Sequence, residues 1–492
     1  MDPNFLNSQN IYLTTTLPYV NAKPHIGFAL EIVQADFLAR AHRLAGRSVL
    51  FNFGTDEHGQ KIYQKAKELN LEVQEYVDRS AEQFQVLRRG LNLSYDNFIR
   101  TTDPVHVKAA QEFWRRCRDN GDIYQARYQV KYCVGCELEK TESELVNGVC
   151  PLHPDRELEL IDEENYFFRF SRYTERLLEL YQQQPEFVRP NWRQKEVAGF
   201  VSQGLRDFSI SRLKSKMPWG VPVPDDPDHV MYVWFDALVN YVSTLGWPET
   251  AQRPRGKSEE PGDFDKWWPV IQLAGKDNLR QQAAMWQAML LSAGLPPSRQ
   301  IMIHGFINDG LGQKMSKSSG NVIDPLELVE NYGTEAVRYY LLRHINPFED
   351  FNFSSAYFLE SYNAHLANGL GNLVSRIMKM ASTHLSSPIT PTEPELPAEM
   401  QRAIDEFRFD QALEVPWRKI AYLDDRIAET RPFKLIKTEP ERAKTILREL
   451  LDELYGIGHL LLPAMPATGQ KIKDLVAANE MPSEPLFIRR EI

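Results

Sequence analysis

The sequence predicts an α/β protein in which a Rossmann-type parallel-sheet domain carries a small cysteine-containing insertion and is followed by an α-helical bundle. Three observations support this fold class. A strand, helix, strand pattern opens the chain, three of its four cysteines cluster between residues 133 and 150, and strand-like segments stop after about residue 355 while helical periodicity continues. The architecture therefore has at least three parts.

The first part begins with a buried strand, because residues 11–15 are apolar and β-branched. Apolar residues then recur at helical spacing over residues 29–45, and Gly46 can cap the end of that helix. Residues 48–54 form a second apolar, strand-like run. Such a βαβ unit predicts an open parallel sheet with its ligand crevice at the carboxyl ends of the strands.

The βα pattern is interrupted between about residues 117 and 224 and then resumes. Residues 230–234 and 270–274 are again predicted to be strands, so the interruption is an inserted domain. Residues 252–262, rich in proline, glycine and charge, are expected to form a surface loop. Helical patterns over 356–380, 399–430 and 439–462 then predict a separate bundle, with proline punctuation at Pro432 and Pro440.

Composition limits the class of protein. A chain of 492 residues predicts two to four domains, and 42% hydrophobic with 25% charged residues argues against fibrous, disordered and membrane proteins. The apolar runs fall well short of a bilayer span, and the first residues resemble neither a secretory signal nor a transit peptide, so we expect a cytoplasmic protein with no membrane partner. The net charge of −10 means that a nucleic-acid partner needs a local basic patch.

Two distant segments have the chemistry of a phosphate site. In His25-Ile26-Gly27, a glycine before a helix lets a ligand approach the helix N-terminus, although alone this is equally typical of an ordinary turn. Residues 314–321 place two lysines and three serines in a glycine-flanked loop, which can neutralise a departing pyrophosphate or be a solvated loop. Together they predict an ATP-consuming enzyme with a split ATP site.

The cysteine cluster predicts a metal site. Cys133 and Cys136, followed after thirteen residues by Cys150 and His153, have the spacing of a closed tetrahedral zinc knuckle. Four protein ligands leave no open position, so we expect one structural Zn2+; buried free thiols are the alternative. Cys117 lies outside the pattern and is expected to be an ordinary buried thiol.

At this point the chain resembles a known family. The two phosphate segments look like the two signatures of class I aminoacyl-tRNA synthetases. Five further segments, in order, narrow the resemblance to the methionyl-tRNA synthetase family, over about residues 11–325 and more thinly beyond. These segments are residues 17–21 (Leu-Pro-Tyr-Val-Asn), 54–59 (Gly-Thr-Asp-Glu-His-Gly), 219–224 (Trp-Gly-Val-Pro-Val-Pro), 232–237 (Tyr-Val-Trp-Phe-Asp-Ala) and 275–277 (Gly-Lys-Asp).

The resemblance implies an activity and an ATP site. Such an enzyme activates L-methionine with ATP, accompanied by Mg2+, to methionyl-adenylate and pyrophosphate, and passes the methionyl group to the 3' end of tRNA(Met), elongator and, we expect, initiator. The catalytic residues would be His25, Lys314 and Lys317. The ATP-binding residues would be His25, Gly27, Lys314, Ser316, Lys317 and Ser318.

The resemblance also implies a methionine pocket. Asp56 would bind the α-ammonium group, since a carboxylate suits a cationic amine. The whole set would be Leu17, Tyr19, Asp56, Trp234, Ala237, Leu238, Tyr241 and Gln282. Without the family, Trp234 and Tyr241 would be ordinary core aromatics. The chain departs from the family pattern at Phe28, where a second histidine is usual, and at Gln282, where many members have histidine.

In the helical region the resemblance implies an anticodon-binding domain. Asn372 and Arg376, one helical turn apart, would read anticodon bases, and Phe433 would stack on a base in place of the usual tryptophan. A solvent-facing polar pair is the alternative for Asn372 and Arg376. The knuckle would belong to the family's connective domain.

The implied domains are a catalytic first half (1–116), a connective insertion with the zinc knuckle (117–225), a catalytic second half (226–320), a stem-contact linker (321–355) and an anticodon-binding domain (356–492). Leucyl, isoleucyl and valyl synthetases need an editing domain, for which the insertion has no room. A nucleotidylyltransferase would lack the lysine loop, and a non-catalytic RNA-binding paralogue would not need Asp56 or His25. Because the chain ends soon after the bundle, we expect a monomer.

Overall fold

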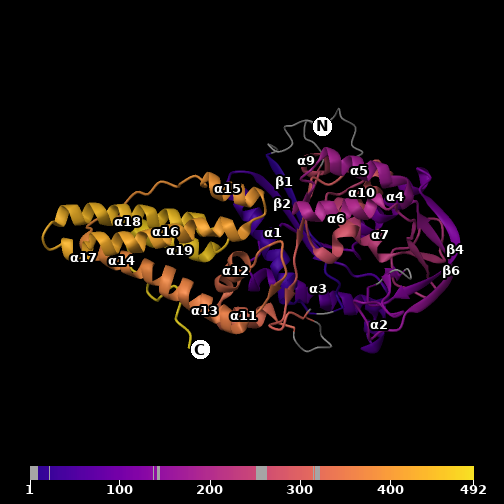
Figure 1. Ribbon diagram of the computed structural model, residues 1–492, viewed down its shortest axis with the longest axis horizontal. Coiled ribbons are helices and arrows are strands. Elements are labelled where there is room, and N and C mark those ends of the chain that lie inside the picture. The colour runs from indigo at the N-terminus through magenta and orange to yellow at the C-terminus, as the bar shows by residue number, and fades with distance from the viewer. Residues whose placement is uncertain are drawn as a thin grey trace.

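The computed structural model describes residues 9–21, 23–136, 138–140, 144–250, 263–313, 315 and 322–491. An α/β part lies on one side of the molecule, and an elongated helical bundle extends from it on the other (Figure 1). The predicted fold class, a parallel sheet with an insertion followed by helices, is confirmed.

The central sheet has six parallel strands in the order β3-β2-β1-β11-β12-β7. Its strands are β1 (Asn10–Thr15), β2 (Ser48–Thr55), β3 (Asn97–Arg100), β7 (Val188–Arg189), β11 (Ile271–Gly275) and β12 (Gln300–His304). In the register, Leu13 lies between Phe51 and Ile271. The direction of winding reverses between β1 and β11, and ligands of such sheets bind outside the carboxyl ends of the strands at that switch point. The predicted strands at 11–15, 48–54 and 270–274 are all members of this sheet.

Helices cover both faces of the sheet, which explains why nearly all residues of β1, β11 and β12 are buried. The helices of the α/β part are α1 (Ile26–Leu44), α2 (Gln60–Glu68), α3 (Val73–Gly90), α4 (Pro104–Asp119), α5 (Thr174–Gln183), α6 (Asn191–Ser202), α7 (Val233–Leu238), α8 (Asn240–Ser243), α9 (Asp263–Trp267) and α10 (Trp286–Ser292). Helix α1 is buried over most of its length and begins directly above the carboxyl end of β1.

The insertion is built on an antiparallel sheet in the order β5-β4-β6-β8. Its strands are β4 (Ile123–Cys133), β5 (Leu138–Lys140), β6 (Glu159–Phe168) and β8 (Phe208–Ser209), and a separate antiparallel pair joins β9 (Ser211–Leu213) to β10 (His229–Met231). The long hairpin of β4 and β6 lies at the end of the molecule opposite the bundle (Figure 1).

The prediction of a strand at 230–234 is wrong in its second half. Strand β10 ends at Met231 and pairs with β9 outside the central sheet, and the chain enters helix α7 at Val233. Helix α7 is apolar on nearly every side because it is enclosed by protein, and a short apolar run does not distinguish a buried helix from a buried strand. The predicted loop 252–262 lies outside the described residues.

The C-terminal part is helical, as predicted. Its elements are α11 (Pro325–Tyr332), α12 (Thr334–Arg343), α13 (Ser355–Ser361), a π-helical stretch (Tyr362–Gly371), α14 (Asn372–His384), α15 (Ala398–Asp405), α16 (Phe409–Thr430), α17 (Pro432–Leu435), α18 (Pro440–Leu461) and α19 (Pro466–Ala478). A short parallel pair joins β13 (Ile307–Asn308), which precedes α11, to β14 (Phe351–Asn352), which lies between α12 and α13. The predicted helix 399–430 is broken at Phe407, which has a φ of +57°.

Pro432 and Pro440 each occupy the first turn of a helix, where a missing N–H costs nothing. Within the described part of the chain, no helix combines the length and the apolar character needed to cross a membrane.

One arginine joins the two parts. Arg338 of α12 is fully buried, and its Nη1 lies 2.7 Å from Oδ2 of Asp36 in α1. The same guanidinium donates to the carbonyls of Leu91 (3.0 Å), Pro463 (3.0 Å) and Ala464 (2.7 Å). Burial opposes the charge of Asp36, but Arg338 and its other partners outweigh it and lower the pKa of this carboxyl. This satisfied buried ion pair therefore joins the sheet to the bundle, beside a continuous apolar core.

Replacing Arg338 with methionine should lower the free energy of unfolding by about 3–5 kcal/mol, because Asp36 would keep a buried charge without its main partner. The double variant R338M/D36N should recover part of that loss. The matched control is R442M, whose ion pair with Glu439 is exposed and should contribute under about 1 kcal/mol. Urea unfolding of the full chain measures the free energy of unfolding of all three variants. An equal loss of this free energy in R338M and R442M would contradict the stabilising role given to Arg338.

Candidate active site

A cavity of about 400 Å³ opens at the switch point of the sheet, a size typical of small-molecule sites. It is bounded by the segments that follow β1, β2, β11 and β12, by the first turn of α1, and by α7 and α8. Ten of the residues proposed from the sequence line it together: Leu17, Tyr19, His25, Gly27, Asp56, Trp234, Ala237, Leu238, Tyr241 and Gln282. Segments more than 250 residues apart in the chain thus meet in one pocket.

His25 caps the N-terminus of α1. Its Nδ1 accepts a hydrogen bond from the backbone N–H of Phe28 at 3.3 Å, so a neutral ring carries its proton on Nε2 and can donate from there. Helix α1 also directs the positive end of its dipole at the pocket, which favours a phosphate. Gly27 leaves little room for a side chain, since a Cβ there would lie 3.1 Å from the His25 ring.

Phe28 has a clear apolar role. Its ring packs 5.5 Å from the rings of Phe53 and Phe84 and faces the same pocket. A histidine would have to bury its polar nitrogens between these two rings. The chain therefore has an apolar surface where its relatives are expected to have a second polar donor.

The second half of the predicted ATP site lies mostly outside the described residues. Lys314, Ser316, Lys317 and Ser318 lie outside the described residues, whereas Met315 between them lines the pocket. The chain that follows is fixed to α1, because the N–H of Ile26 donates to the carbonyl of Ile323 at 3.0 Å. The segment that returns from the lysine loop thus contacts the first turn of α1, beside His25.

Asp56 is held at the edge of the pocket by backbone bonds to the loop after β1. Its N–H donates to the carbonyl of Pro18 at 3.0 Å, and its carbonyl accepts from Val20 at 3.3 Å. The side chain is 4% exposed and lines the pocket. A buried carboxylate in this position favours a cationic ligand group.

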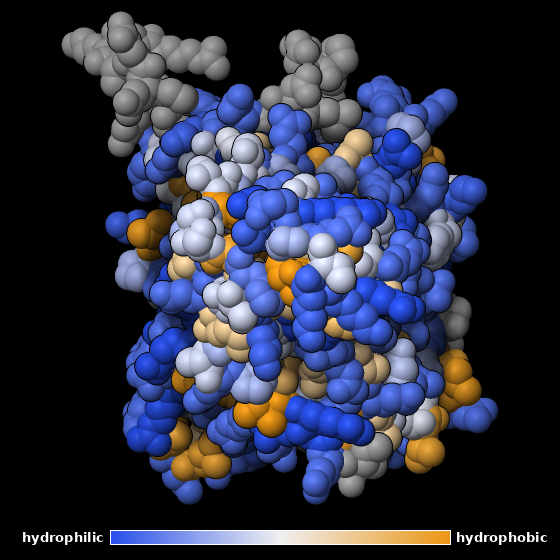
Figure 2. All heavy atoms as spheres, turned by 90° about the vertical axis from the view of Figure 1, so that its left-hand side faces the viewer, coloured by the Kyte–Doolittle hydropathy of each residue, from blue (hydrophilic) through white to orange (hydrophobic). Residues whose placement is uncertain are grey.

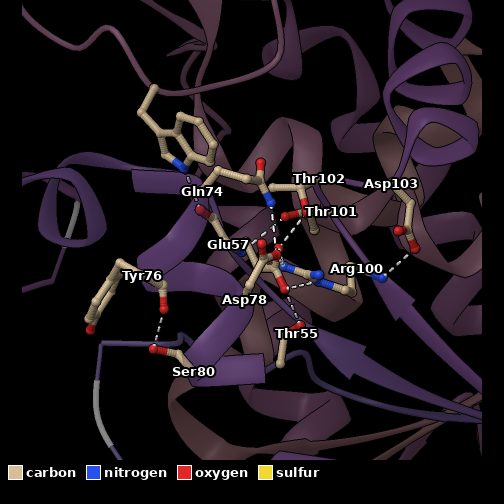
Figure 3. Close-up of polar contacts among 11 residues, drawn as sticks. Thr55, Glu57, Gln74, Tyr76, Asp78, Ser80, Arg100, Thr101, Thr102 and Asp103 are labelled. Atoms are coloured by element: carbon tan, nitrogen blue, oxygen red, sulfur yellow. Dashed lines mark hydrogen bonds and ion pairs between the residues drawn. The ribbon is translucent and has the colours of Figure 1, made fainter. Parts of the chain in front are cut away.

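Glu57, the next residue, points away from the pocket into a polar cluster (Figure 3). Its carboxylate accepts from Nε and Nη2 of Arg100 at 2.7 and 2.9 Å, and from the hydroxyls of Thr55 at 2.7 Å and Thr102 at 2.5 Å. Arg100 also pairs with Asp78 of α3 at 2.6 Å. The loop that carries Asp56 is thereby tied to β3 and α3.

The wall opposite Asp56 is largely apolar with one polar end. The Gln282 amide donates to the Tyr241 hydroxyl at 2.9 Å and accepts from Gln272 at 2.9 Å, while the Tyr12 hydroxyl fixes the Tyr241 carbonyl at 2.9 Å. Gln282 lies in a π-helical turn (Gln281–Met285), a feature common at functional sites. The buried Trp234 indole N–H has no hydrogen-bond partner among the described residues.

Two further residues of the pocket were not predicted from the sequence. Glu31 Oε2 lies 2.8 Å from His304 Nε2, and Glu31 Oε1 accepts from the N–H and hydroxyl of Thr16 at 2.7 and 2.6 Å. Burial opposes a charged His304 ring, but Glu31 and the Gly305 carbonyl outweigh it and raise the pKa of His304. A signal was present, because Glu31 is a charged residue among the largely apolar residues at the start of α1.

The cysteine cluster has the geometry of a metal site. The ligand atoms of Cys133, Cys136, Cys150 and His153 all lie within 4.8 Å of one another. Cys136 Sγ is 3.5 Å from Cys150 Sγ and 3.3 Å from His153 Nδ1, close to the edges of about 3.5–3.8 Å expected for ligands around zinc. A Cβ on Gly135 would lie 2.3 Å from the His153 ring, so the turn needs glycine. The four residues fit a tetrahedral metal ion such as Zn2+, and Cys117 is a separate buried thiol of α4.

Purified protein should contain one zinc per chain, and chelation should lower its melting temperature, because ligand binding energy of such sites is also folding energy. C136A should lose the metal. The matched control C117A, at a buried cysteine outside the cluster, should retain it. Metal analysis by mass spectrometry decides between them, and full zinc content in C136A would contradict the assigned ligand set.

The three residues proposed to bind the anticodon lie on the bundle. Asn372 begins α14 and is exposed, and Arg376, one turn later, pairs with Asp424 of α16 at 2.7 Å. Phe433 lies on α17 and is 47% exposed. Figure 2, which looks onto this end of the molecule, shows a mostly hydrophilic face with small, separate apolar groups.

Comparison with known proteins gives one consistent result. The family model for tRNA synthetases class I (M) matches residues 11–159 and 141–378. A methionine–tRNA ligase of Synechocystis sp. is 42% identical over 94% of this chain and 88% of its own length, and one of Rhizobium meliloti is 39% identical over 95% and 91%. The solved structure of Mycobacterium tuberculosis methionyl-tRNA synthetase in complex with methionyl-adenylate superposes with a TM-score of 0.88, at 35% identity, over 98% of this chain and all of that one.

Proposed function

The chain belongs to the methionyl-tRNA synthetase family of class I tRNA synthetases, which makes it a ligase, and we propose that the pocket at the carboxyl ends of β1 and β11 is where it activates methionine. The observation that carries the proposal is the convergence of ten residues, named beforehand from separate motifs, on the walls of one cavity. The proposed substrates are L-methionine, ATP and tRNA(Met).

Asp56 and α7 would hold the amino acid between them. The buried Asp56 carboxylate would bind the α-ammonium group, and the thioether would lie against Trp234, Ala237 and Leu238. Leu17, Tyr19, Tyr241 and Gln282 would complete the pocket. Aromatic contact with sulfur contributes only about 0.3–1.5 kcal/mol, so most selectivity must come from the shape of the pocket and the polar end at Gln282.

His25 and the lysine loop would hold the phosphates. The methionine carboxylate attacks the α-phosphorus of ATP, the bond from that phosphorus to the bridging oxygen breaks, and pyrophosphate leaves with the bond's electrons. Nε2–H of His25, the N-terminus of α1 at Gly27, and the ammonium groups of Lys314 and Lys317 would stabilise the growing charge, with Ser316 and Ser318 as further donors. Mg2+ would accompany ATP and neutralise part of the phosphate charge.

The same pocket would then transfer the methionyl group to the 3' end of tRNA(Met), elongator and initiator. Asn372, Arg376 and Phe433 would contact the anticodon, since exposed amide, guanidinium and aromatic groups suit unstacked bases. The cluster of Cys133 would hold one structural Zn2+. We also propose the domain boundaries near residues 116, 225, 320 and 355, and action in the cytoplasm; the monomeric state stays a prediction.

ATP/pyrophosphate exchange with purified protein and each standard amino acid tests the proposal. Methionine should support exchange, and leucine, isoleucine and valine should not, because these branched side chains would have to fill a pocket shaped for an unbranched chain. Exchange with one of these three instead of methionine would overturn the substrate. Absence of exchange with every amino acid would favour a binding-only role.

Two variants in the same assay separate the two halves of the site. D56N should raise the methionine KM about tenfold or more with little effect on the ATP KM, because it removes the charge that pairs with the ammonium group. K317A should lower kcat about 100-fold or more and leave methionine binding intact. The matched control is K444A, an exposed bundle lysine that pairs with Glu441. Near-normal exchange in K317A would refute the role given to Lys317.

A further inference from the structure

A buried carboxylate next to the pocket is not used by the chemistry above. Asp236 of α7 is fully buried, and its two oxygens face two imidazoles: Oδ2 lies 2.6 Å from His58 Nδ1, and Oδ1 lies 2.7 Å from His106 Nε2. His58 belongs to the loop after β2 and His106 to the first turn of α4. One carboxylate thus joins three elements.

The hydrogen-bond directions follow from the partners. Nδ1 of His106 lies 2.9 Å from the Ser243 hydroxyl, so a neutral ring accepts there and donates Nε2–H to Asp236. His58 donates to Asp236 through Nδ1, whereas His106 donates through Nε2. Burial opposes the charge of Asp236, but His58 and His106 outweigh it and lower the pKa of this carboxyl to about 2. The Asp236 carboxylate is therefore ionised at any working pH.

Asp236 connects two elements that carry pocket-lining residues, α7 and the loop after β2. Its neighbours Ala237 and Leu238, and Trp234 one half-turn earlier, line the cavity from α7. His58 follows Asp56 by two residues in the loop that forms the facing wall. Between them lies Glu57, whose carbonyl accepts a hydrogen bond from the Trp219 indole N–H at 2.6 Å, and this bond fixes the loop in place. The Asp236 to His58 bond consequently spans from the wall beside the thioether to the wall beside the ammonium group.

We propose that Asp236 is a positioning residue that sets the separation between Asp56 and the α7 wall, and hence the length of amino acid that the pocket selects. The proposal rests on the methionine site proposed above. Asp236 contacts neither the substrate nor the reacting atoms. It acts by holding α7 against the loop after β2, with His106 fixing the second oxygen so that the carboxylate cannot rotate.

Loss of this tie has a specific signature. If α7 can move outward, methionine loses simultaneous contact with Asp56 and Trp234, so its KM rises. A substrate with a longer side chain, such as ethionine, loses less because the wider pocket accommodates its extra methylene. The ATP KM should change little, because His25 and the lysine loop lie on other elements.

The two histidines supply matched variants, since each donates through a different nitrogen. Asparagine can place an N–H where Nδ1 of His58 lies, and glutamine can place one where Nε2 of His106 lies. H58N and H106Q should therefore have a methionine KM close to that of the wild type and should keep most of its preference for methionine over ethionine. H58L, H106L and D236N should raise the methionine KM about tenfold, as expected when a hydrogen bond to a buried charge is lost, and should reduce the ratio of kcat/KM for methionine to that for ethionine.

Exchange kinetics of the full chain, with melting temperatures measured in parallel, decide the matter. The proposal is supported if each donor-retaining variant behaves like the wild type while its leucine counterpart shows the raised methionine KM and weakened preference. It is overturned if H58N and H58L have the same methionine KM, or if kcat/KM falls by the same factor for methionine and for ethionine. Should D236N fail to fold, the histidine pairs still provide the test. A wild type without methionine-dependent exchange would instead refute the proposed function itself.

Discussion

The buried ion pair of Glu57 and Arg100 is the constraint on which the site depends. Three consecutive side chains after β2 point in three directions: Asp56 into the pocket, Glu57 back to Arg100, and His58 across to Asp236. Glu57 is fully buried, so removing Arg100 would leave a charge that costs several kcal/mol. The hydroxyls of the neighbouring threonines satisfy its remaining lone pairs. The loop is therefore rigid where its first member must meet a ligand.

Close packing adds to this constraint. Gly54, at the end of β2, lies so near β3 that a Cβ would be 1.9 Å from the carbonyl of Ile99. Only glycine lets β2 approach β3 closely enough for Arg100 to reach Glu57. The same short segment thus combines a glycine needed for packing, a buried charge needed for anchoring, and a carboxylate facing the substrate pocket.

Helix α1 extends this rigidity to the bundle. Its first turn bears His25 and Gly27 at the pocket, and its middle bears Asp36, which pairs with Arg338 at the junction with the helical part. A 19-residue helix is about 28 Å long, so the phosphate end and the far end of the helix are held at a fixed spacing. Because the Arg338 guanidinium also binds carbonyls between α18 and α19, it links α1 directly to the bundle. That geometry suits an enzyme that must engage both ends of one RNA.

Local patterns predicted more of the site than of the contacts that support it. The βαβ unit followed from apolar periodicity, and the motif residues from Leu17 to Gln282 do line one pocket. Val233 and Trp234, the first two residues of α7, were wrongly predicted as the end of a strand, because a short apolar run does not distinguish a buried helix from a buried strand. The pairs of Glu31 with His304 and of Asp36 with Arg338 join residues roughly 270 and 300 positions apart. No spacing rule connects such residues, and each appears in the sequence only as a polar residue in an apolar helix or strand.

The most direct test of this account is a crystal structure of the protein with L-methionine bound. The account predicts the α-ammonium group within hydrogen-bonding distance of the Asp56 carboxylate and the sulfur against Trp234 and Ala237, with Glu57 still paired to Arg100. Methionine bound outside this cavity, or bound in it with its ammonium group on Glu31 and its side chain directed away from α7, would contradict it.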